Sequence, residues 1–311
     1  MMDWTDRHCR FLHRQLTSRA LLFTEMVTSA ALVHGDPERL IGYDEIEHPV
    51  AVQLGGSDPD ELARATKICQ QFGYDEINLN VGCPSDRVQA GRFGACLMAE
   101  PDLVAQCVIA IRGETDKPVT VKCRIGIDDS DIEKDLDIFA DKMVEAGVPT
   151  LYVHARKAWL KGLSPKENRT IPPLDYDRVH RLAKRLAPFP VIINGGIETL
   201  EQCQEQLEKV DGVMLGRAAY HNPFMLSQVD QLIFGEDKPA PTLAQIANIM
   251  MAYTDKELAK GTRLNHITRH MIGLGYAMPG ARKFRQIMTM DVLEEGAGSH
   301  TIARAFDVLN L

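Results

Sequence analysis

One cysteine of the chain stands where a thiol could act on a bound molecule. Cys83 lies in the segment 80–85, just past an apolar run and between a glycine and a proline. A thiol with an unperturbed pKa of about 8.5 is mostly protonated at neutral pH and can donate a proton, whereas a depressed pKa would make it a nucleophile. The surrounding residues leave both roles open. Free cysteine is usually a small buried hydrophobe, which is the interpretation for Cys107, Cys123 and Cys203.

Three polar side chains at the ends of other apolar runs could border a flat heterocycle. Gln53, Lys122 and His154 each end a β-rich run. A glutamine offers a donor and an acceptor, a lysine stabilises developing negative charge, and a histidine donates or accepts. A lone buried histidine is more often structural, so the shared position at the ends of the runs carries this prediction.

Glycines after the last two β-rich runs predict a phosphate site. One run ends in Asn194, Gly195 and Gly196, and the next in Gly216 and Arg217. Glycines let backbone N–H groups approach an anion closely, and an arginine adds a charge-assisted contact. These glycines could instead only form turns, but both loops carry the feature, which favours the phosphate.

The elements that must position these residues alternate between strand and helix. Seven β-rich runs, most of them continuously apolar as in a buried parallel sheet, cover residues 21–27, 50–55, 76–82, 119–126, 150–156, 191–196 and 212–217. Helical patterns follow near 58–71, 101–113, 131–146, 175–187 and 198–208. This alternation predicts a parallel α/β fold. In a TIM (β/α)8 barrel, the working residues lie at the carboxyl ends of the strands.

Only seven of the eight strands of such a barrel are visible. Residues 1–6 resemble the loop that follows a strand, so we expect most of the first strand to lie before residue 1. An open, doubly wound sheet needs no eighth strand, but no GxGxxG motif follows the first run to support it. The prediction is therefore a TIM barrel with a truncated first strand.

The alternation stops near residue 235. Residues 235–242 form a proline-rich linker, and helical patterns without strands follow near 242–260, 263–274, 279–290 and 299–309. The sequence thus predicts two domains, a barrel over residues 1–234 and a small all-α helical bundle over residues 235–311.

Composition excludes several classes of protein. Of the 311 residues, 45% are hydrophobic and 25% are charged, which excludes a mainly disordered chain. No stretch approaches the roughly 20 apolar residues of a membrane span, and the first ten residues carry charges where a signal peptide would be apolar. Seven cysteines without a CxxC pair argue against a disulfide framework or a zinc site. We expect a cytoplasmic protein without membrane or metal.

Charge is distributed unevenly along the chain. The net charge of −8 argues against a nucleic-acid partner, but residues 242–311 carry eight basic and six acidic side chains, which is +2. Residues 156–170 hold five basic side chains and one acidic one. A charge run such as Arg282, Lys283 and Arg285 is normally a solvated face, although local patches decide whether a phosphate backbone can dock.

Several segments together resemble the tRNA-dihydrouridine synthases. They cover essentially the whole chain in order and are residues 77–88, 119–129, 154–169, 193–197, 211–223 and 266–286. Segment 154–169 is similar to the branch that modifies positions 20 and 20a of the tRNA D-loop, whereas the NGG and GR motifs alone would fit many flavin barrels.

The resemblance implies a reaction and a cofactor. Family members bind FMN in a (β/α)8 barrel, use NADPH to reduce it, transfer hydride to C6 of a uracil, and donate a proton to C5 from a cysteine. Carried over, Cys83 is the proton donor. The implied FMN contacts are Met1, Met2, Gln53, Lys122, His154, Asn194, Gly195, Gly196, Gly216 and Arg217. The two methionines follow the family's first strand, whose tail contacts the flavin.

The resemblance also implies a macromolecular partner. Asn80 would face a uridine that is flipped out of the tRNA. Glu167, Arg169, Thr170, Arg282 and Arg285 match positions expected to bind tRNA, which would make the C-terminal bundle a tRNA-binding domain. The resemblance also implies a monomer.

Two rival functions stay open at this point. A flavin barrel could act on a free pyrimidine, but a free base needs no basic helical appendage. A chain that lacks its first strand could instead bind tRNA without catalysis.

Overall fold

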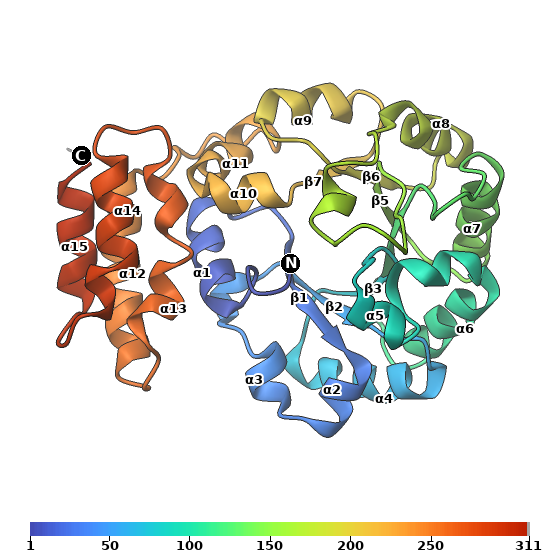
Figure 1. Ribbon diagram of the computed structural model, residues 1–311, viewed down its shortest axis with the longest axis horizontal. Helices are drawn as coiled ribbons and strands as arrows, with labels where there is room; N and C mark the ends of the chain where they lie inside the picture. The colour runs from blue at the N-terminus through green and yellow to red at the C-terminus, as the bar shows by residue number, and fades with distance from the viewer. Residues whose placement is uncertain (310–311) are drawn as a thin grey trace.

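Seven parallel strands form the centre of the molecule. The structure, a computed structural model, describes residues 1–309 apart from the side chains of Asp86 and Arg87. The strands are β1 (Leu22–Thr28), β2 (Val50–Gly55), β3 (Glu76–Asn80), β4 (Val119–Arg124), β5 (Leu151–His154), β6 (Val191–Asn194) and β7 (Gly212–Met214). Each pairs in parallel with the next, and the sheet curls into part of a barrel with helices outside (Figure 1). The predicted parallel α/β architecture, similar to a TIM barrel, is confirmed.

Helices cover the outer face of the sheet. Five of them lie where the sequence predicts helices, namely α4 (Pro59–Phe72), α6 (Pro101–Arg112), α7 (Lys134–Glu145), α8 (Tyr176–Leu186) and α9 (Leu200–Leu207). The short helices α2 (Ser29–His34) and α3 (Pro37–Ile41) are not among the predicted ones. In α4, the Asp58 side chain accepts from the backbone N–H of Glu61, and Pro59 occupies the first turn. The helix ends at Gly73, which has a φ of 77°. Capping residues, a proline in the first turn and a terminal glycine are visible in the sequence, which explains why the predicted and observed bounds of α4 agree.

The sheet is open between its two outermost strands. Within residues 1–309, no hydrogen-bonded pair joins β7 to β1. The chain before β1 forms α1 (Arg7–Leu16), which is not among the predicted helices and begins at an Asp6 cap. The eighth strand before residue 1 stays a prediction.

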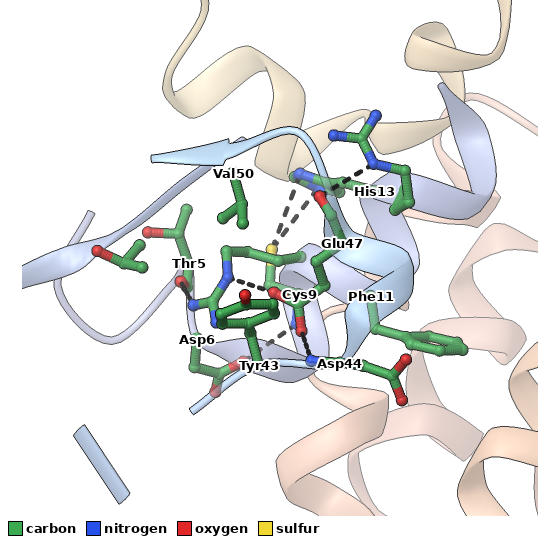
Figure 2. Close-up of polar contacts among 12 residues, drawn as sticks. Thr5, Asp6, Cys9, Phe11, His13, Tyr43, Asp44, Glu47 and Val50 are labelled. Carbon is green, nitrogen blue, oxygen red and sulfur yellow. Dashed lines mark hydrogen bonds and ion pairs between the residues drawn. The ribbon is translucent and has the colours of Figure 1, made fainter. Parts of the chain in front are cut away.

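Helix α1 is attached by a buried ion pair. The Arg10 guanidinium donates to the Glu47 carboxylate at 2.6 Å, and the Glu47 side chain is fully buried. Arg14, in the next turn, donates to backbone carbonyls, including that of Pro49 just before β2. Figure 2 shows Glu47 close to Cys9 and His13 of this helix.

Replacing Arg10 by methionine is expected to lower the free energy of unfolding by about 3 kcal/mol at pH 8, because Glu47 loses its buried partner. Burial already raises the pKa of Glu47, and Arg10 opposes that rise. Without Arg10 the folded-state pKa rises further above the unfolded value, so stability is lost as pH increases through it. The loss should therefore be smaller at pH 5, as measured by urea unfolding at both pH values.

The control is Arg19→Met, which removes an exposed pair with Glu236. This variant should change the free energy of unfolding by no more than about 0.5 kcal/mol. Equal losses for Arg10→Met and Arg19→Met, or no dependence on pH, would contradict the buried-pair account.

The C-terminal part of the described chain is helical. It contains α12 (Leu243–Leu258), α13 (Leu264–Thr268), α14 (Ala281–Thr289) and α15 (Ser299–Asp307), with α15 packed on α12 and α14 (Figure 1). No strand follows residue 214 among the residues that the structure describes. The predicted helices are confirmed, whereas a separate domain beginning at residue 235 stays a prediction.

Helix α1 joins these helices to the sheet. His8 Nδ1 lies 2.7 Å from the Tyr253 hydroxyl on α12, and Phe11 stacks on the same tyrosine ring at 3.8 Å between centroids. Asp6 pairs with Arg269 and His270 beyond α13.

In the described chain, none of the helices has the length and apolar character that crossing a bilayer requires.

Candidate functional site

The carboxyl ends of the strands bring the predicted polar residues together. In the sheet register, Asn80 lies opposite Lys122, Arg124 opposite His154, and His154 opposite Asn194. Residues far apart in the sequence therefore meet at one edge of the sheet, as expected for parallel strands.

The loop after β3 holds Cys83 through one side chain. Asn80 Oδ1 accepts from the backbone N–H groups of Gly82 at 3.0 Å and Cys83 at 2.9 Å. The thiol is half-buried, with Sγ 3.7 Å from the Ser85 hydroxyl. Cysteines 107, 123 and 203 are buried, which confirms their predicted structural role. Among these four, Cys83 is the one whose thiol can meet a ligand.

Arg124 at the end of β4 ties this loop to a second one. Its Nε donates to the Gly82 carbonyl at 2.9 Å, and its Nη1 donates to the carbonyls of Lys157 and Asn168, both at 3.0 Å. Burial lowers the pKa of Arg124 to about 10, which still leaves it charged at neutral pH. Arg124 is not among the predicted site residues, although its position at a strand end is a signal in the sequence.

His154 at the end of β5 has a ring nitrogen free for a ligand. Its Nδ1 is buried and has no hydrogen-bond partner among the described residues. Burial, helped by the nearby charges of Arg124 and Lys122, lowers its pKa well below the usual value, so the ring is neutral. A Cβ at Gly195, where φ is 118°, would lie 3.1 Å from His154 Nε2. A glycine at this position thus keeps the space beside the ring clear.

Positive charge gathers around His154, on which Lys122, Arg124, Arg156 and Arg217 act electrostatically. Arg169 lies beside Arg124 and Arg217. These five residues are here called the cationic cluster. Within the described part of the chain, none of them forms an ion pair with a carboxylate. Arg217, at the start of the short helix α10 (Arg217–His221), donates to the Arg169 carbonyl at 3.2 Å. Burial, with Arg124 next in effect, lowers the pKa of Lys122 to about 8. The cluster suits an anion such as a phosphate.

A cavity of about 530 Å³ opens between β1 and β7. Met1, Gln53, Lys122, Tyr152 and Gly216 line it, together with many apolar side chains. The volume and the mostly apolar wall are typical of small-molecule and cofactor sites.

The cavity accounts for part of the predicted cofactor set. Met1, Gln53, Lys122 and Gly216 line it, whereas Met2 is 55% exposed and is not a lining residue. The other predicted contacts lie at or just after the carboxyl ends of β5, β6 and β7 and do not line the cavity. They are His154, Asn194, Gly195, Gly196 and Arg217. Asn194 also has a structural role, because its Nδ2 donates to the Met214 carbonyl at 2.7 Å.

The loop that carries Glu167, Arg169 and Thr170 is organised by a residue between them. The three predicted side chains are exposed, whereas Asn168 is fully buried. The Asn168 amide accepts from the Trp159 N–H at 2.7 Å and donates to the Trp159 and Leu163 carbonyls. Arg124 holds the same loop from the sheet side, so the predicted substrate residues stand on a fixed support.

Arg282 and Arg285 lie on α14, away from the sheet edge. Both are exposed and one turn apart, while Phe284, Ile287 and Met288 face the helical core. Neither arginine forms an ion pair within residues 1–309. This face of α14 is free to meet a polyanion.

The structure contains further polar residues beneath the site that the sequence analysis does not single out. Glu76, Asn78, Thr120 and Tyr152 are buried inside the sheet and hydrogen-bonded to one another. The signal was the alternation of polar side chains at positions 76, 78 and 80 within an otherwise apolar strand. No group of three or more potential metal ligands occurs in the described part of the chain.

Comparison with known proteins supplies a family. The family model described as "Dihydrouridine synthase (Dus)" matches residues 1–306. Proteins named tRNA-dihydrouridine(20/20a) synthase from Vibrio cholerae and Shewanella oneidensis are 53% and 54% identical over 306 residues, which is 98% of this chain and 93% and 91% of theirs. The relative of that name from Yersinia pestis is 50% identical over 311 residues, covering 100% of this chain and 90% of its own.

Solved structures of distant sequence share the fold. Morphinone reductase superposes with a TM-score of 0.52 at 11% identity, covering 79% of this chain and 85% of its own. A 2-naphthoyl-CoA reductase superposes with a TM-score of 0.54 at 11% identity, covering 73% and 47%. At this identity the likeness concerns the curled parallel sheet and its helices alone.

Proposed function

The chain belongs to the dihydrouridine synthase family, and from that premise we propose that it reduces the 5,6 double bond of uridine at positions 20 and 20a of the tRNA D-loop. Relatives that carry this activity in their name are 50–54% identical over nearly the whole chain. One observation supports the proposed chemistry above all. Asn80 binds the backbone N–H of Cys83, and the half-buried Cys83 thiol lies beside the cationic cluster.

Flavin mononucleotide is the cofactor that these residues fit. The free Nδ1 of His154 and the space beside Gly195 leave room and a polar partner for a ring system. The cationic cluster suits the phosphate, and Gln53, Lys122 and His154 would border the ring while Gly216 and Arg217 would hold the phosphate. When bound, flavin mononucleotide supplies the hydride for C6 of the uracil, drawn from NADPH.

Cys83 provides the proton that completes the reduction. The thiol donates its proton to C5, the thiolate that remains takes up a proton from solvent, and the uracil gains two hydrogens in all. Lys122, Arg124 and Arg169 lie near enough to the Cys83 side chain to interact with it electrostatically.

The target uridine must leave its stack to reach the site. Asn80 Nδ2 donates one hydrogen to Gln53 and keeps a second for a uracil carbonyl. Glu167, Arg169 and Thr170 stand on the ordered loop beside the cationic cluster, and Arg282 and Arg285 offer a second contact for the tRNA backbone. Residues 235–311 would then act as a tRNA-binding domain; a cytoplasmic location and a monomeric state stay predictions.

Mass spectrometry of unmodified tRNA tests the function. Incubation with the chain, NADPH and flavin mononucleotide should add two hydrogens to a D-loop uridine. Reduction of free uracil with the tRNA left unchanged would favour a free-pyrimidine reductase. Unchanged tRNA in the presence of bound, reducible flavin would favour a tRNA-binding protein without catalysis.

Replacing Arg217 by alanine should weaken flavin mononucleotide binding about 10- to 150-fold, because a charge-assisted hydrogen bond of about 1.5–3 kcal/mol is lost. Riboflavin, which lacks the phosphate, serves as the matched ligand, and its affinity should stay within twofold. Flavin fluorescence titrations measure both. Equal weakening for the two ligands would place the phosphate elsewhere.

A further inference from the structure

A chain of hydrogen bonds runs through the buried interior of the sheet to the backbone of Cys83. Its members, here called the amide chain, are Glu76, Thr120, Asn78, Gln53 and Asn80, all of them buried. The sheet register places Gln53 opposite Asn78 and Asn78 opposite Thr120. Because side chains alternate along a strand, positions 76, 78 and 80 of β3 point to the same side.

In the amide chain, each side-chain amide accepts one hydrogen bond through its oxygen and donates the next through its nitrogen. Asn80 Oδ1 accepts from the Cys83 N–H, and Asn80 Nδ2 donates to Gln53 Oε1 at 2.8 Å. Gln53 Nε2 donates to Asn78 Oδ1 at 2.9 Å. Asn78 Nδ2 donates to the Thr120 hydroxyl oxygen at 2.8 Å, and the Thr120 hydroxyl donates to the Glu76 carboxylate.

The direction of the amide chain is set at its Cys83 end. The backbone N–H groups of Gly82 and Cys83 can only donate, so the atom of Asn80 that faces them must be its oxygen. Each later link follows from that orientation, and the Thr120 oxygen, which accepts from Asn78, has its own hydrogen left to donate to Glu76. If the oxygen and nitrogen of one side-chain amide exchanged positions, its NH2 group would face another N–H donor in a buried site, which is unfavourable.

We propose that the amide chain positions Cys83, because Glu76 and Thr120 act through Asn78 and Gln53 to hold Asn80 in the orientation that captures the Gly82 and Cys83 backbone. The proposal rests on the proposed function, in which Cys83 donates the proton to C5. Glu76 and Thr120 are positioning residues, since the interior of the sheet separates them from the thiol.

Two hydrogen bonds reach the buried carboxyl group of Glu76. Burial raises the pKa of Glu76 to about 7, and the hydrogen bonds from Thr120 and Tyr152 oppose that rise. The Tyr152 hydroxyl donates to Glu76 Oε2 at 3.1 Å, outside the amide chain. Tyr152 therefore offers a control at the same carboxylate.

Thr120→Val tests the proposal, because valine keeps the shape of threonine and removes the hydroxyl link. Amide hydrogen exchange at Gly82 and Cys83 should become about tenfold faster. The kcat for dihydrouridine formation should fall about tenfold, with the KM for tRNA and the bound flavin within twofold. Thr120→Ser should restore both values, and Tyr152→Phe should leave the exchange of these two amides within twofold.

Two results would overturn the proposal. Unchanged exchange at Gly82 and Cys83 in Thr120→Val would show that the amide chain does not hold this backbone. Faster exchange throughout the sheet would show that Thr120 only stabilises the fold. If Thr120→Val does not fold, Gln53→Met breaks a later link with a side chain of similar length, and amide exchange alone decides the outcome, since Gln53 also borders the flavin site.

The positioning role and the proposed function can fail separately. Product formation by the unaltered chain tests the function, whereas amide exchange needs neither flavin nor tRNA. Slow exchange that depends on Thr120 in a chain without reductase activity would support the positioning role and reject the function.

Discussion

Replacing Cys83 by alanine is expected to lower the rate of dihydrouridine formation by about 10²–10⁴-fold, the usual contribution of a positioned general acid. NADPH should still reduce the bound flavin, because the thiol takes no part in that half of the reaction. Single-turnover assays with tRNA, read by mass spectrometry, measure the first step, and flavin absorbance under anaerobic conditions measures the second.

Cys96 provides the matched control for this variant. It is the other half-buried cysteine of the chain, and its thiol donates to the Phe93 carbonyl rather than facing the strand ends. Cys96→Ala should keep product formation within about twofold. Full product formation by Cys83→Ala would reject the role of Cys83 as proton donor.

The double variant Arg282→Ala with Arg285→Ala is expected to weaken tRNA binding about 10- to 100-fold at low salt. Each lost phosphate contact should also lower the slope of log affinity against log salt by about 0.7–0.9, so the pair should lower it by about 1.5. Both side chains are exposed on one face of α14 and form no ion pair in the described chain. Fluorescence anisotropy with labelled tRNA at several salt concentrations measures affinity and slope together.

A control variant at a second pair of arginines distinguishes the loss of a tRNA contact from the change in net charge. Arg181 and Arg185 on α8 pair with Glu133, just before α7, and with Asp141 on α7, and their double replacement by alanine changes the net charge equally. This control should leave the salt slope unchanged. An unchanged slope in the Arg282 and Arg285 variant would place the tRNA on another surface, and equal effects of the two pairs would indicate a response to net charge alone.

The site was predictable where local pattern and sheet geometry act together. Parallel strands end at a common edge, so Lys122, His154 and Asn194 could be placed together from the ends of three apolar runs. The two-sided burial of these strands makes the runs continuous and easy to find.

Helix α1 shows where the pattern fails. Four of its eight buried residues are His8, Arg10, His13 and Arg14, so polar side chains make up half of its buried surface. Their partners, such as Glu47 and Tyr253, lie far away in the sequence, and only the folded chain brings them into contact.

The cationic cluster shows how composition can mislead. A net charge of −8 argues against an anionic partner, yet the cationic cluster comes together from the end of β4 and from the segments after β5 and β7, with no carboxylate as an ion-pair partner in the described chain. Local arrangement decides what a surface attracts.

The sequence by itself determined the alternation of strands and helices, the polar residues at the strand ends and the position of Cys83 just after a strand. These follow from residue type and short-range periodicity. Tertiary structure alone decided that Arg124 ties two loops, that His154 keeps a free nitrogen, and that buried amides orient Asn80 toward the Cys83 backbone. Hydrogen-bond direction depends on which donor meets which acceptor across neighbouring strands, and that pairing exists only once the sheet has formed.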